Sequence, residues 1–83
     1  MVKRLHYKES LEHSADVLLV AHDNKEEVWD LVKDAQNVSR KWFDLEYELS
    51  IGKYAVVGPD DCLSVLPEYA IKMIFEEETQ CLS

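Results

Sequence analysis

The sequence has few of the residues that build chemical sites. Its 83 residues include only two glycines, two cysteines and three histidines. Two glycines cannot form a glycine-rich phosphate loop, and every histidine stands forty or more residues from Cys62 and Cys81, too far for a zinc-type spacing. Two cysteines also do not make a disulfide framework. We therefore expect no metal site, no cofactor and two reduced thiols.

Signatures of catalysis are missing as well. No serine stands in a nucleophile elbow, and Cys62 lacks any local signature. Glu46 and Glu48, two residues apart in a predicted strand, fall on one exposed face, whereas glycosidase carboxylates must face each other across a cleft. His22 and Asp23 are neighbours and could act as an acid–base pair in an enzyme. They stand between a predicted strand and a predicted helix, however, and a histidine at such a junction typically makes a structural hydrogen bond. We predict a non-enzymatic protein without catalytic residues.

Basic residues are scarce in the second half of the chain. The whole sequence holds 17 acids and nine bases, for a net charge of −8. Residues 43–83 contain nine of the acids but only two of the bases. An acidic half repels phosphate, which argues against direct binding of nucleic acid, and it attracts a basic protein surface.

Long hydrophobic runs are absent too. The longest, residues 17–21, is far shorter than the roughly 20 residues that a membrane-spanning helix needs. The charged start, Met-Val-Lys-Arg-Leu-His-Tyr, has no secretory pattern. We expect a cytoplasmic protein with no membrane association, folded as one domain over residues 1–83. A homodimer would add buried surface to so small a core.

Helical periodicity marks two segments. Residues 24–42 predict a central amphipathic helix with acids in its first turn and bases in its last. Its predicted buried face is apolar: Val28, Leu31, Val32, Ala35, Val38 and Trp42. Residues 67–79 predict a C-terminal helix that begins with a proline. The main alternative is a mainly α-helical fold in which residues 10–22 form an N-terminal helix.

The remaining segments predict strands. The apolar run in residues 16–22 reads as a buried strand, and residues 3–9 would then be a first strand that pairs with it. Residues 45–51 alternate apolar and polar side chains, which predicts a half-buried strand, and residues 54–57 would return antiparallel to it. Residues 58–61 break the chain and can start a helical turn. The prediction is an α+β fold of ββαββα type, an antiparallel sheet with helices on one face.

The leading functional hypothesis is a small acidic protein-binding module, an inhibitor or regulator. Its partner would be a larger protein with a basic, nucleic-acid-binding surface, and its acids would mimic phosphates. The layout is similar to that of the small inhibitors that phages make against host or defence machinery, in architecture rather than in any motif. The predicted partner-binding residues are acids and aromatics: Asp44, Glu46, Glu48, Asp60, Asp61, Glu76, Glu77, Glu78, Trp29, Phe43 and Tyr47.

Two alternatives stay open. Trp29 and Phe43 would instead cover the sheet inside the monomer if they point inward. The protein would instead be a dimer that sequesters a small molecule or nucleotide if Arg40 and Lys41 converge on a cavity. Trp42 or Tyr54 would then stack on the ligand, whereas in the docking hypothesis Tyr54 and Tyr69 are further anchors.

Overall fold

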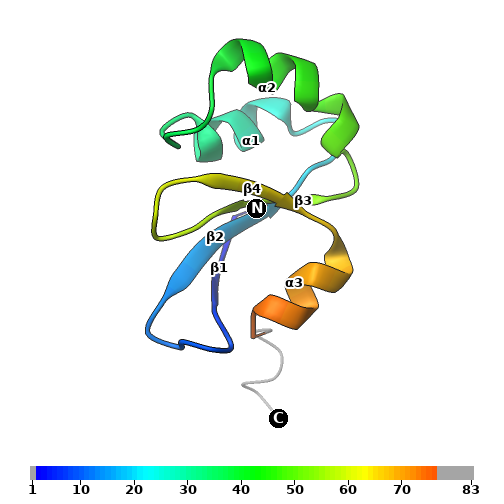
Figure 1. Cartoon of the computed structure of the whole chain (residues 1–83). Coiled ribbons are helices and arrows are strands. Elements are labelled where there is room, and N and C mark those ends of the chain that lie inside the picture. The colour runs from blue at the N-terminus through cyan, green and yellow to red at the C-terminus, as the bar shows by residue number, and fades with distance from the viewer. Residues whose placement is uncertain (1, 77–83) are drawn as a thin grey trace.

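A four-stranded antiparallel sheet lies between two layers of helix (Figure 1). The structure, a computed structural model, describes residues 2–76. The strands follow the order β1-β2-β3-β4 in the sheet. Their bounds are Lys3–His6 (β1), Ser14–Leu19 (β2), Tyr54–Val57 (β3) and Leu63–Leu66 (β4). The α+β class predicted from the sequence is confirmed.

The helices divide between the two faces of the sheet. One face carries α1 (Lys25–Val32), α2 (Arg40–Glu46) and the short 3-10 helix η1 (Glu48–Ser50). The other face carries α3 (Glu68–Ile74), as Figure 1 shows. The prediction that the helices share one face is therefore wrong, because the central strands are apolar on both sides.

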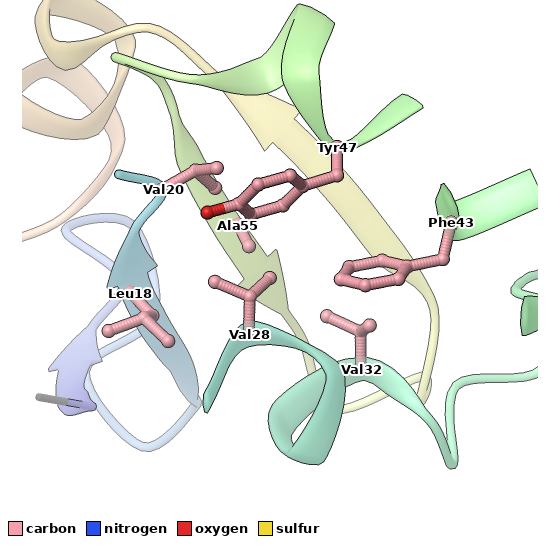
Figure 2. Close-up of a cluster of buried hydrophobic side chains, with 7 residues drawn as sticks. All are labelled: Leu18, Val20, Val28, Val32, Phe43, Tyr47 and Ala55. Atoms are coloured by element: carbon pink, nitrogen blue, oxygen red, sulfur yellow. The ribbon is translucent and has the colours of Figure 1, made fainter. Parts of the chain in front are cut away.

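Two apolar clusters hold these layers together. The cluster under α1 and α2 consists of Leu18, Val20, Val28, Val32, Phe43, Tyr47 and Ala55 (Figure 2). The cluster under α3 consists of Leu5, Ala15, Val17, Val56, Ile71 and Phe75. Neighbouring residues of a strand point to opposite faces, so the unbroken apolar run in β2 supplies both clusters. The N-terminal helix over residues 10–22 is thereby excluded.

The predicted helix over residues 24–42 is two helices. Its first part ends at Val32, where Ala35 N–H bonds to the Val32 carbonyl at 2.9 Å in a tight turn. The second part begins at Ser39, whose Oγ accepts a hydrogen bond from the Trp42 N–H at 3.2 Å. This serine cap starts α2 in a new direction. Of the predicted buried face, Val28 and Val32 are buried, whereas Trp42 is exposed.

The predicted strand over residues 45–51 is wrong. These residues continue α2 and form η1, and the chain then turns at Gly52, whose φ of 90° lies in the left-handed region that favours glycine. In a strand, Leu45, Tyr47 and Leu49 would share one face. In the helical conformation Tyr47 points into the core beside Phe43, and Leu45 and Leu49 point outward.

Strand β4 is absent from the prediction. Residues 58–61 form the hairpin loop between β3 and β4, closed by an Asp61 N–H to Gly58 carbonyl bond of 3.0 Å, and they start no helix. The C-terminal helix begins after Pro67 as predicted but ends at Ile74. Phe75 is extended and pairs with Tyr7 beside β1. Residues 77–79 of the predicted helix lie outside the described residues.

Candidate protein-binding surface

Large apolar side chains lie exposed along one side of α2 and η1. Leu45 and Leu49 are 70% and 71% exposed, and Trp42 is 39% exposed. With Glu46, they fall at the spacing that places helical residues on one side. We call the surface formed by Trp42, Leu45, Glu46, Glu48 and Leu49 the docking face.

A groove of about 320 Å³ adjoins the docking face and runs between α2, η1 and the outer strand β4. Its apolar lining comes from Trp42, Leu49, Leu63 and Val65. Its polar lining comes from Asn37, Glu46, Ser50 and Lys53. The groove is therefore lined by apolar and polar residues in equal number, and it offers a partner both apolar contact and hydrogen-bonding groups.

The outer edge of β4 is largely closed. The Asn37 side chain accepts a hydrogen bond from the Leu63 N–H at 2.8 Å and donates one to the Leu63 carbonyl at 3.0 Å. Pro67 has no N–H, and its carbonyl accepts bonds from the first turn of α3. Between these two closures lies Val65.

Two acids of the docking face carry uncompensated charge. Among residues 2–76, neither Glu46 nor Glu48 has an ion-pair partner. Asp44 differs, because it lies 3.2 Å from the Lys25 ammonium and 3.0 Å from the Arg40 guanidinium. The hydrogen bond from Lys25, followed by the charge of Arg40, holds the pKa of Asp44 below its ordinary value. Asp44 is thus the least available of the three for a partner.

Arg40 is occupied by internal contacts. Its guanidinium lies 3.3 Å from Glu26 and 3.0 Å from Asp44, and it stacks over the Trp29 ring at 5.1 Å. The hydrogen bond to Glu26 is the largest of the causes that raise the pKa of Arg40. Such engagement leaves Arg40 poorly placed to bind a nucleotide phosphate.

The predicted aromatic anchors lie in or against the core. Phe43 and Tyr47 are 3% and 6% exposed, so their assignment to a partner surface is wrong (Figure 2). The Tyr47 hydroxyl donates to the Ala21 carbonyl inside the protein. Trp29 is half-buried with its ring 5.2 Å from that of Phe43. These aromatics cover the sheet within the monomer, the alternative that the sequence left open.

The remaining predicted acids do not join the docking face. Asp60 and Asp61 lie in the β3–β4 loop, at the opposite end of β3 from η1. The Glu76 N–H bonds to the His6 carbonyl at 2.9 Å, which places it at the β1 edge of the sheet. Glu77 and Glu78 lie outside the described residues. One continuous acidic surface, as the sequence suggested, is not formed by the described acids.

The residues that could indicate a nucleotide site or a metal site do not come together either. Tyr54 packs with the α3 cluster, on the other side of the sheet from Trp42. Within residues 2–76 no group of three acids, histidines or cysteines could hold a metal ion. Cys62 is a half-buried free thiol, and Cys81 lies outside the described range. None of the helices that the structure describes is both long and apolar enough to cross a membrane.

Comparison of the chain with protein-family models, with curated proteins and with solved structures finds no match. The geometry of the surface therefore carries the functional argument.

Sequence reasoning found Glu46 and Glu48 but missed the apolar members of the docking face. It took Leu45 and Leu49 for the buried side of a strand. The signal that could have found them is the pair Phe43 and Tyr47, one helical turn apart, which turns the leucines outward.

Proposed function

We propose that this chain is a non-enzymatic protein-binding module that acts in the cytoplasm as an inhibitor or regulator. It docks on a larger protein whose surface carries basic and apolar groups. The observation that carries the proposal is the docking face, where exposed Leu45 and Leu49 lie beside the carboxylates of Glu46 and Glu48, which have no ion-pair partner among residues 2–76. A partner that also uses its basic surface for nucleic acid would be blocked.

The two kinds of side chain make different contributions. Burying a leucine that is now exposed contributes about 1.5–3 kcal/mol, so the leucines supply affinity. The carboxylates speed encounter with a basic partner and exclude acidic ones. The net charge of −8 acts in the same direction over a longer range. The docking face thus favours a cationic partner with an apolar centre.

A matched pair of double variants tests the proposal. Leu45→Ser with Leu49→Ser removes the apolar centre. Tyr69→Ser with Met73→Ser removes two side chains of similar exposure, 70% and 72%, from α3 on the other side of the sheet. Tyr69, a further anchor in the expectation from the sequence, is thus separate from the docking face and can serve in the control. Tagged proteins are used for affinity capture from a cell lysate at several salt concentrations. We expect one or more proteins with basic surfaces to be captured by the wild type and the α3 variant, and lost with the docking-face variant.

Charge reversal gives a second arm of the same test. Glu46→Lys with Glu48→Lys should abolish the capture, and the wild-type capture should weaken as salt rises. Capture that survives both docking-face variants, or that disappears only with the α3 variant, would overturn the proposal. A rise of several degrees in melting temperature with a single nucleotide, and no captured protein, would support the sequestering protein in its place.

A further inference from the structure

Val65, which lines the groove beside β4, has backbone groups that no other residue of the described range 2–76 pairs on the open side. In an antiparallel sheet, successive residues turn both N–H and C=O alternately toward one neighbour and the other. Because Leu63 bonds outward to Asn37, Ser64 faces β3 and Val65 faces outward again. Within residues 2–76, no group bonds to Val65 on this open side.

We propose, building on the function proposed above, that the groove binds a short extended cationic segment of the partner. One residue of that segment pairs with Val65 through two backbone hydrogen bonds. Addition of a strand at a sheet edge is an established way to bind peptides, in which the backbone gives affinity and alternate side chains give specificity.

The closures on either side of Val65 set the length of the segment. Asn37 already occupies Leu63, and Pro67 offers neither a free N–H nor a free carbonyl. A long strand therefore cannot add along β4, and the pairing is limited to one residue. A helix gains nothing from Val65, because its own N–H and C=O groups are bonded internally.

The groove also selects side chains. A residue directly opposite Val65 points its side chain to the same face of the sheet, toward Trp42 and Leu63. An apolar side chain fits there. A lysine or arginine two residues away reaches along the groove to the unpaired carboxylate of Glu46, while Lys53 marks the end of the groove that accepts no second cation.

The test uses a defined probe, a pentapeptide with acetylated and amidated ends. It has valine at its centre, threonine on either side, lysine at one end and glutamine at the other, and it is made in both orders. Titration of the isotope-labelled full chain at millimolar peptide, followed by NMR, should shift the Val65 amide and the Trp42 indole in a saturable manner. Absence of both shifts overturns the proposal.

Methylation of single peptide nitrogens separates strand pairing from other contacts. Methylation at the central valine removes the N–H that bonds to the Val65 carbonyl and should weaken binding more than tenfold. Methylation at a neighbouring threonine, whose N–H points away, should change it less than twofold. Equal effects at the two positions overturn the proposal, as does equal binding of a peptide with glutamate in place of the lysine.

A variant of the protein provides an independent arm. Val65→Pro removes the outward N–H at an edge position where proline is tolerated and should abolish the peptide shifts, whereas the α3 double variant should keep them. If Val65→Pro does not fold, the methylated peptides decide. Partner capture lost with the Leu45 and Leu49 variant but kept by a folded Val65→Pro variant overturns this inference alone. Peptide binding at Val65 without any docking-face capture overturns the proposed function instead.

Discussion

Phe43 and Leu45, two residues apart in α2, lie in opposite environments. Phe43 is 3% exposed and packs between Trp29 and Tyr47, with ring centroids 5.2 Å and 5.8 Å away. Leu45 is 70% exposed. An aromatic and an aliphatic residue in one short helix thus have separate roles, one in stability and the other at the surface.

Truncation of each residue should show this difference. Phe43→Ala leaves a cavity in the cluster under α1 and α2 and should lower the free energy of unfolding by about 3–5 kcal/mol. Leu45→Ala should change it by less than about 0.5 kcal/mol, as surface substitutions do. Urea denaturation followed by circular dichroism measures both. A larger loss for Leu45→Ala than for Phe43→Ala would contradict the packing of α2.

Asp44 gives a prediction of pH dependence. Its folded-state pKa is lowered by Lys25 and Arg40, so its ion pairs stabilise the fold fully above the ordinary value of 3.8. That stabilisation is lost as the pH falls through the lower, folded-state pKa. The difference in urea midpoint between wild type and Asp44→Asn should therefore be present at neutral pH and shrink below about pH 4. A difference that stays constant into acid would show that the pairs do not form in solution.

At the scale of elements, the sequence predicts strands and helices best where one period continues without interruption. The apolar run of β2 and the acids in the first turn of α1 were sufficient for these elements, whereas the bases expected in the last turn, Arg40 and Lys41, begin α2. The break between α1 and α2 was missed because apolar residues keep a helical spacing across it by coincidence. The local signal was Ser39, a strong cap residue inside what looked like one helix.

The cap at Ser39 can be tested directly. Ser39→Ala removes the acceptor for the Trp42 N–H and should cost about 1 kcal/mol of stability. Ser39→Asp keeps an acceptor oxygen and should restore most of that loss. Thermal and urea unfolding of the two variants measure the difference. Equal stability of Ser39→Ala and wild type would contradict a separate start for α2.

A strand was wrongly predicted over residues 45–51 because this segment fits both the two-residue period of a strand and the period of a helix. Residues 45–51 alternate as a strand does, yet they also place Phe43 and Tyr47 one helical turn apart. Tertiary packing decided between the two, because the rings of both residues fill the space between α1 and β3. Short alternating segments carry this ambiguity, and no local rule resolves it.

For the whole molecule, the amount of charge could be counted from the sequence, but the placement of the charged residues on the surface could not be predicted. Asp44 is neutralised by two bases, whereas Asp61 and Glu76 lie at other parts of the sheet from Glu46. Acids that are close together along the chain do not form one surface when a hairpin and a long connection carry them to different parts of the fold. The net charge nonetheless acts on the molecule as a whole.

A net charge of −8 on 83 residues predicts a response to salt. Raising ionic strength from about 0.01 M to 0.15 M shortens the screening length from about 30 Å to about 8 Å. Repulsion among the acids weakens, while exposed ion pairs contribute little. The melting temperature should therefore rise with sodium chloride over this range, as calorimetry would measure. A fall would mean that the ion pairs around Arg40 outweigh the repulsion.

The amide of Asn37 has a consequence for the ageing of the protein. It donates to one group of Leu63 and accepts from the other, which only an uncharged amide can do. Deamidation would turn the donor into a second acceptor and set it against the Leu63 carbonyl. The edge of the sheet would then open next to Val65. An aged preparation would therefore expose an unpaired strand edge, which is prone to aggregation, and a fresh preparation would not.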